Sequence, residues 1–138
     1  MNWTLEVVVI PVSDIDRAKA FYADQLCFAV DHDTRMGEGR RLVQLTPPGS
    51  GCSIVLGEGV VPDMPPGSLR GLQLVVADIV KAHAELVERG VAVGEVTAVD
   101  GDATKVARGG SALDNVGFLF FADPDGNGWA VQQISARG

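Results

Sequence analysis

The sequence predicts one α+β domain of 138 residues, built from two copies of a βαβββ module. Three features predict this architecture: a segment that occurs twice, an aspartate that caps a helix in each copy, and a Gly- and Pro-rich stretch between the copies. We place the first module at about residues 4–58, the linker at about 59–69 and the second module at about 70–134.

The repeat is read directly from the residues. "VSDIDRA" (12–18) returns as "VADIVKA" (76–82), an offset of 64 residues, and Ala29-Val30 returns as Ala92-Val93, an offset of 63. A one-residue gap therefore separates the copies. A period this long does not fit a solenoid and is typical of a duplicated half-domain.

Each element of the first copy has a local signal. The apolar run at 5–12 predicts a strand, Ser13 or Asp14 caps the helix that follows, and Tyr22 belongs to the packed face of that helix. The helical spacing is carried by Ile15, Ala18, Phe21, Tyr22 and Leu26. "RRLVQLT" (40–46) and "CSIVLG" (52–57) are further strands.

The second copy repeats this order. A strand at 72–76 precedes a helix that begins at Asp78 and ends at Gly90, as expected of a C′ glycine. Strands are expected at 93–99, 116–122 and 128–134, with Asp123-Pro124-Asp125-Gly126-Asn127 as the turn between the last two. Residues 100–115 show no periodicity and are interpreted as either a mobile lid or a tolerated insertion.

Charge and cysteine content restrict the partners. Eleven basic and eighteen acidic residues give a net charge of −7, which repels a phosphate backbone, so no nucleic-acid partner is expected. The apolar run at 5–12 is too short for a membrane span and has no basic lead-in, so no membrane partner is expected. Cys27 and Cys52 are expected to be reduced and mostly packed, and we infer a cytoplasmic protein.

Several motifs occur together in a fixed order. "V-x-D-I" opens both helices, "AFY" (20–22) lies in the first helix, "ERGV" (88–91) follows the second, and "DPDGN" (123–127) forms the last turn. With this set, the chain resembles the vicinal oxygen chelate superfamily, also called the glyoxalase/bleomycin-resistance/dioxygenase family, over about residues 4–134. The resemblance implies an open, eight-stranded, barrel-like mixed sheet with helices on its convex side, a cleft on its concave side, and frequent homodimers.

The resemblance also assigns metal-ligand positions. In metalloenzymes of the family, four cleft positions carry His, Glu or Gln, and here they correspond to Val7, Gly71, Ala130 and either Ser53 or Val55. A divalent ion in such a site requires imidazole or carboxylate groups, which these residues do not provide. We therefore expect no metal and no other cofactor, and neither glyoxalase nor dioxygenase chemistry.

The same positions define the expected cleft lining. Because side chains alternate between the faces of a strand, fixing Val7 and Ala130 in the cleft assigns the other residues and sends Trp129 and Val131 to the helix side. Gln44, Gln73 and Gln132 are either polar contacts for a ligand or residues of a wet rim. The predicted ligand-binding residues are Val7, Val9, Gln44, Ser53, Val55, Gln73, Val75, Phe118, Phe120, Ala130 and Gln132.

Two functions fit these features. The first is a metal-free binding protein that sequesters a bulky, apolar aromatic natural product, as in antibiotic self-resistance. Under this hypothesis no residue is catalytic. The second is a metal-free cyclase, isomerase or lyase-like enzyme acting on a similar ligand. That enzyme needs an acid or base in the cleft, and His32, Glu6 or a loop carboxylate are the candidates.

Overall fold

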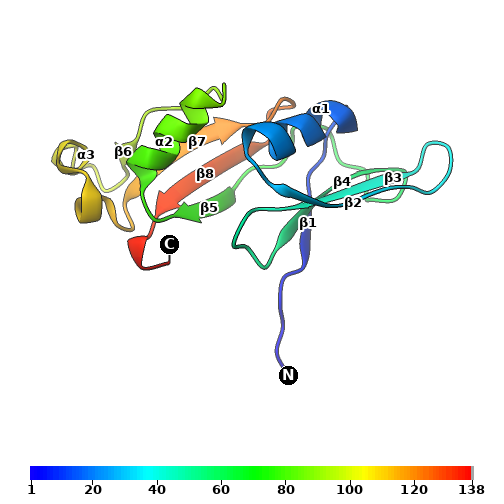
Figure 1. The fold of residues 1–138 in the computed structure, drawn as a ribbon, viewed down its shortest axis with the longest axis horizontal. Helices are drawn as coiled ribbons and strands as arrows, with labels where there is room; N and C mark the ends of the chain where they lie inside the picture. The colour runs from blue at the N-terminus through cyan, green and yellow to red at the C-terminus, as the bar shows by residue number, and fades with distance from the viewer. Residues whose placement is uncertain (138) are drawn as a thin grey trace. The chain divides into compact units, whose positions relative to one another are not determined.

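The computed structural model describes residues 1–137, and the chain divides into two compact units (Figure 1). Unit 1 comprises Met1–Leu69 together with Asp123–Asn127, and unit 2 comprises Arg70–Ala122 and the chain from Gly128 onward. Each unit contains one βαβββ module and one four-stranded mixed sheet, which confirms the α+β class and the duplicated architecture. No helix within residues 1–137 has the length and apolar character needed to cross a membrane.

Unit 1 has the sheet order β1-β4-β3-β2, in which only the β1–β4 pair is parallel. Its helix α1 covers one face of this sheet and continues into a π-helical segment, η1. The elements are β1 (Val7–Val9), α1 (Ile15–Ala20), η1 (Phe21–Gln25), β2 (Ala29–Arg35), β3 (Arg41–Thr46) and β4 (Ser53–Glu58).

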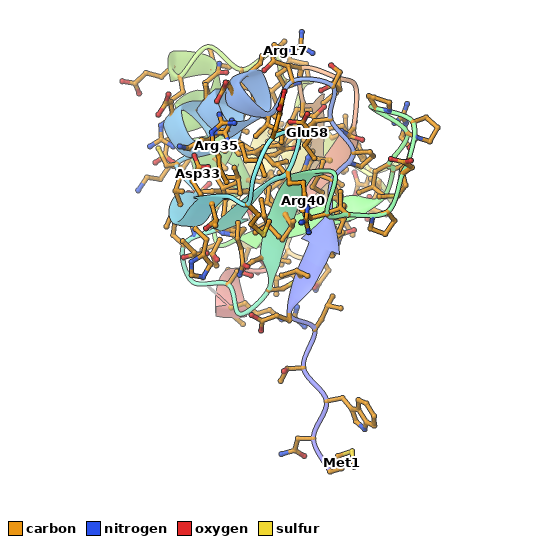
Figure 2. The ribbon with its side chains drawn as sticks, turned by 90° about the vertical axis from the view of Figure 1, so that its right-hand side faces the viewer. Met1, Arg17, Asp33, Arg35, Arg40 and Glu58 are labelled. Carbon is orange, nitrogen blue, oxygen red and sulfur yellow. The ribbon has the colours of Figure 1, made fainter. Side chains whose placement is uncertain are left out.

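Strand β1 is shorter than the predicted strand at 5–12 because backbone hydrogen bonding to β4 cannot continue beyond either of its ends. Val7 pairs with Ser53, the first residue of β4, so the preceding residues have no partner strand to continue along. At the other end Pro11 has no N–H to donate. Residues 1–6 extend away from the sheet of their own unit, with Met1 at the tip (Figure 2).

The one-residue gap in the repeat has a structural counterpart in the first helix. Asp14 caps α1 by accepting a 3.0 Å hydrogen bond from the Arg17 N–H, and Asp78 accepts the equivalent 3.1 Å bond from Lys81. The extra residue of the first copy is absorbed between cap and helix end as the π-helical segment η1, whereas the second helix is regular. A π-helical turn is closed by i→i+5 hydrogen bonds, so it holds one residue more than an α-helical turn.

Unit 2 has the sheet order β5-β8-β7-β6, with β5 and β8 parallel and the remaining pairs antiparallel. Its elements are β5 (Leu72–Val76), α2 (Ile79–Glu88), β6 (Thr97–Ala98), α3 (Thr104–Arg108), η2 (Gly110–Leu113), β7 (Gly117–Ala122), β8 (Gly128–Gln133) and η3 (Ser135–Arg137). Gly90 ends α2 as predicted: it has φ of 79°, and Val91 N–H donates to the Leu86 carbonyl at 3.0 Å.

One sequence expectation for unit 2 was wrong, and one open alternative can be compared with the structure. The strand predicted at 93–99 forms only β6 and an isolated bridge between Val93 and Phe121, and the two pairings differ in register by one residue, which interrupts the ladder. The aperiodic segment 100–115 contains α3 and η2 and buries Leu113 completely, so it is a folded insertion with its own anchor.

Candidate ligand-binding site

The faces of the unit 2 sheet are fixed by one hydrogen bond. Gln133 on β8 accepts a 3.0 Å bond at its side-chain oxygen from the backbone N–H of Ile79, the first residue of α2. Every second residue of β8, counted from Gln133, therefore faces α2. Trp129 and Val131 are buried on this side of the sheet, as predicted. The opposite face carries Gln73, Val75, Phe118, Phe120, Ala130 and Gln132, and we call these six residues the open face of unit 2.

Strand register brings the open face of unit 2 together. Ala130 pairs with Gln73 on one side and with Phe120 on the other. Gln132 likewise lies between Val75 and Phe118. All six residues are among those predicted from the sequence, and they form two adjacent rows across three strands.

Two phenylalanine rings form an exposed apolar part of this face. Phe120 is 51% exposed and Val75 is 38% exposed, although both are apolar residues in strands. The rings of Phe118 and Phe120 stack with centroids 6.1 Å apart and an interplanar angle of 13°. Since Leu119 and Phe121 are buried on the α2 side, β7 is apolar on both faces, and such exposed apolar surface is typical of an interaction site.

The two glutamines of this face form an ordered pair. Gln73 donates from its side-chain amide to the Gln132 side-chain oxygen at 2.7 Å, and Gln132 donates to the Asn115 carbonyl at 2.8 Å. The side-chain oxygen and the side-chain nitrogen of Gln132 therefore each make a hydrogen bond within the protein. The side-chain oxygen of Gln73 accepts no hydrogen bond from a described residue, so it is the acceptor offered to a ligand.

A pocket of about 240 Å³ adjoins this face at the start of β8. Aromatic rings and small residues line most of it: its walls are Arg70, Gly71, Phe120, Phe121, Gly128, Trp129 and Ala130. Phe121 and Trp129 stack nearly parallel, with centroids 6.1 Å apart. The sequence did not predict Arg70, because its place in the pocket wall depends on the backbone conformation at Gly71, which has φ of 88°.

The sheet of unit 1 also has an open face, opposite α1. Arg41 donates to Asp16 of α1 at 2.8 Å, so residues in step with Arg41 face the helix. The remaining predicted residues, Val7, Val9, Gln44, Ser53 and Val55, lie on the other side by strand alternation. Val55 and Ser53 are nearly fully buried, so this face is more enclosed than the open face of unit 2.

Polar groups on the unit 1 face form a directed chain. Thr46 donates to the Asp31 carboxylate, and the Ser53 and Thr46 hydroxyls are 2.6 Å apart. Because a carboxylate only accepts, Ser53 must donate to Thr46, which leaves acceptor capacity on Ser53 Oγ. His32 pairs with Gln44 across β2 and β3 and shares its face. A separate pocket of about 300 Å³ in this unit lies between Val9, Pro11 and linker residues that include Val61 and Met64.

The residues present do not fit a chelated metal. Val7 is paired with Ser53 in unit 1, and Gly71 and Ala130 line the same pocket in unit 2. Hydrocarbon side chains, a glycine and one hydroxyl do not supply the imidazole or carboxylate donors that a divalent ion needs. The part of the chain that the structure describes also has no cluster of three His, Cys, Asp or Glu side chains placed to hold an ion.

Unit 1 has a cluster of ion pairs on the α1 side of its sheet, and these ion pairs shift the pKa of a carboxyl group. Arg41 contacts Asp33 at 3.0 and 2.9 Å, and Lys19 contacts the same carboxylate at 2.7 Å. These hydrogen bonds, first from Arg41 and then from Lys19, hold the pKa of Asp33 well below its usual range. A carboxyl held ionised in this way supports the fold and is not suited to act as a general acid near neutral pH.

The expectation for the cysteines was partly wrong. Both thiols are unpaired, as expected, but Cys27 is exposed and not packed, and Cys52 is half-buried. Cys27 follows the last helical turn and has φ of 60°, and its Sγ lies 3.9 Å from the Asp24 carbonyl oxygen.

The family model described as Glyoxalase/Bleomycin resistance protein/Dioxygenase superfamily matches residues 4–131. No curated protein sequence matches the chain.

Solved structures extend the comparison. TnmS3, an antibiotic binding protein from Streptomyces sp. CB03234, is 34% identical with a TM-score of 0.74, and the match covers 97% of this chain and 98% of that one. A glyoxalase/bleomycin resistance protein from the same organism is also 34% identical, with a TM-score of 0.71 and coverage of 94% and 100%. A superfamily member from Sphaerobacter thermophilus DSM 20745 is 27% identical, with a TM-score of 0.74 and coverage of 96% and 98%.

Proposed function

The chain belongs to the Glyoxalase/Bleomycin resistance protein/Dioxygenase superfamily, and within it we propose a binding protein that sequesters a planar, largely apolar aromatic compound without a metal. The observation that carries the proposal is the open face of unit 2, where Phe120 is exposed beside the stacked ring of Phe118. An aromatic ligand laid on these rings gains both apolar burial and offset stacking.

The similarity to TnmS3 supports this assignment. That protein is an antibiotic binding protein, and the present chain matches it over nearly the full length of both. We propose a role of the same kind here, in which a bound toxic natural product is kept from its target. The glutamine pair fits such a role because Gln73 offers an acceptor that orients a ligand hydroxyl or N–H without taking part in chemistry.

One observation favours an enzyme as the second candidate. His32 shares the open face of unit 1 with Gln44, and an imidazole is the side chain best suited to proton transfer near neutral pH. A metal-free isomerase or cyclase would use His32 in this position. Chemical change of a bound ligand, absent in a His32→Ala variant, distinguishes this enzyme from a binding protein.

We also propose that the protein is a homodimer. Trp3 is 87% exposed and Leu5 is exposed as well, on the extended segment that ends at Met1 (Figure 2). A second copy of the chain that covers these residues would remove apolar surface from water. Light scattering at micromolar concentration should give twice the 14.5 kDa chain mass. The two unpaired cysteines are consistent with a reducing, cytoplasmic location.

The binding proposal is tested with anthracene-2-carboxamide as a neutral, planar probe. A Trp3→Phe background leaves Trp129, which lines the unit 2 pocket, as the single tryptophan reporter. The probe should quench its fluorescence with saturation, and Phe120→Ala should weaken binding by about tenfold or more. Val87→Ala removes an exposed apolar side chain from α2 and should leave binding unchanged. Equal affinity in both variants would place the ligand elsewhere.

A further inference from the structure

The unit 2 pocket combines apolar walls with one charged group. Of the seven residues that line it, Arg70 alone has a charged side chain, and the others are three aromatic residues, two glycines and an alanine. Apolar walls select for aromatic surface, whereas a guanidinium selects for a negatively charged or strongly accepting oxygen. The lining of the pocket therefore indicates which charge a ligand should carry, and the proposed function does not specify that charge.

The local backbone brings Arg70 to the pocket wall. A Cβ placed on Gly128 would lie 3.0 Å from Cδ of Arg70, so the glycine makes room for the aliphatic part of the arginine side chain. Gly71 has φ of 88°, a conformation that favours glycine, and it adds no side chain beside Arg70. The sequence "RG" at 70–71 and Gly128 thus permit a cation next to an aromatic cavity.

The negative net charge of the protein makes the positive charge of Arg70 important for the binding of any anionic ligand. The net charge of −7 disfavours anionic ligands at long range, so an anion binds only where a local positive group compensates. Burying a carboxylate against Phe120 and Trp129 without a partner would be strongly unfavourable. A guanidinium carries five N–H donors, so Arg70 can bind a carboxylate oxygen in addition to the contact that it already makes within the protein.

We propose that the unit 2 pocket prefers aromatic ligands with an acidic oxygen, a ring carboxylate or an ionised phenol, and that Arg70 determines this preference. The inference rests on the proposed binding function and adds the chemical class of the ligand. In this arrangement the fused rings lie against Phe118 and Phe120, and the acidic oxygen enters the pocket toward Arg70.

A matched pair of probes tests the proposal on the full-length Trp3→Phe protein. Anthracene-2-carboxylate and anthracene-2-carboxamide share ring system and shape and differ in charge at pH 7. We expect the carboxylate to bind about tenfold more tightly than the carboxamide, with a preference that shrinks as salt is added. Arg70→Gln should abolish the preference, and Arg70→Lys should retain part of it.

Arg108→Gln is the control, because it changes the net charge equally at an exposed residue of α3 that does not line the pocket. Wild-type protein that binds both probes equally overturns the role of Arg70 while the binding function stands. Arg108→Gln with the same loss as Arg70→Gln also overturns it, because the effect would then come from net charge. Failure of both probes to bind overturns the proposed function itself. If Arg70→Gln does not fold, the Arg70→Lys variant and the salt dependence of the wild type still decide the question.

Discussion

The Tyr22 hydroxyl donates a 2.8 Å hydrogen bond to the carboxylate of Asp123, which lies 101 residues further along the chain. Both residues belong to unit 1 and are buried, Tyr22 with no exposed surface and Asp123 with 5% exposed. The same carboxylate accepts bonds from the Asp125 N–H and from the backbone and side-chain amides of Asn127. The "DPDGN" turn is therefore a structural part of unit 1, organised around one carboxylate.

Tyr22→Phe should lower the free energy of unfolding by about 1–3 kcal/mol, because it removes one donor from a buried carboxylate and leaves the ring packing intact. Urea unfolding followed by circular dichroism measures the change. Ser13→Ala is the matched control: Ser13 also bonds to the turn, at Asp125, but it is exposed and should change stability by less than about 0.5 kcal/mol. Equal losses in the two variants would contradict the special importance of the buried bond.

Cys27→Gly should stabilise the protein. Cys27 lies 63 residues before Gly90, occupies the same position after its helix, and has φ of 60° where Gly90 has 79°. A residue with a Cβ pays roughly 1–2 kcal/mol in this conformation, and the greater freedom of an unfolded glycine offsets roughly 0.4–1 kcal/mol of the gain. We expect a net gain of about 0.5–1 kcal/mol in urea unfolding.

Gly90→Ala is the reciprocal experiment, and it should destabilise the protein by about 1 kcal/mol. If Cys27→Gly is destabilising while Gly90→Ala behaves as expected, the thiol of Cys27 makes a favourable contribution larger than the backbone strain. The contact between the Cys27 thiol and the Asp24 carbonyl oxygen, at 3.9 Å, would account for this contribution to stability.

The fold was predictable because its signals are local and repeated. Asp14, Asp78 and Gly90 mark helix ends by their own hydrogen-bonding and backbone preferences, and the repeat shows that both modules share one plan. The π-helical segment could not be predicted as such, because a one-residue gap shows that a residue was inserted but not how the helix absorbs it.

The site was less predictable, for a related reason. Strand alternation placed all six residues of the open face of unit 2 on one side, since this property depends only on sequence parity. The pairing of Gln73 with Gln132 depends on register between β5 and β8, and Arg70 enters the pocket through a loop conformation at Gly71. Neither relationship has a signal in the order of the residues alone.

Arg41→Met should lower stability at pH 7 by about 1–3 kcal/mol and make stability less dependent on acid. Arg41 is buried and bonded to Asp33 and Asp16, and it lowers the pKa of both carboxyls. A lowered pKa in the folded state contributes stability above the unfolded value of about 3.9 and loses it as pH falls below that value.

The difference between wild type and Arg41→Met should therefore narrow below about pH 4. Urea unfolding at pH 7, 5, 4 and 3 measures it. Asp16→Asn is the control, because the side chain of Asp16 is largely exposed and its removal leaves the bidentate pair with Asp33 in place. A constant difference across this range would show that Arg41 acts through packing of its aliphatic part and not through its charge.

Val7→Glu should fold with only a small loss of stability, which tests the face assignment of β1. Val7 is half-buried next to Ser53, on the face opposite α1, so a glutamate there has access to solvent. We expect a loss of stability near about 1 kcal/mol in urea unfolding. Ile54→Glu is the contrasting variant, because Ile54 is buried on the α1 side and an unpaired carboxylate there should cost about 4 kcal/mol or more. If Val7→Glu unfolds as Ile54→Glu does, the face assignment of β1 is wrong.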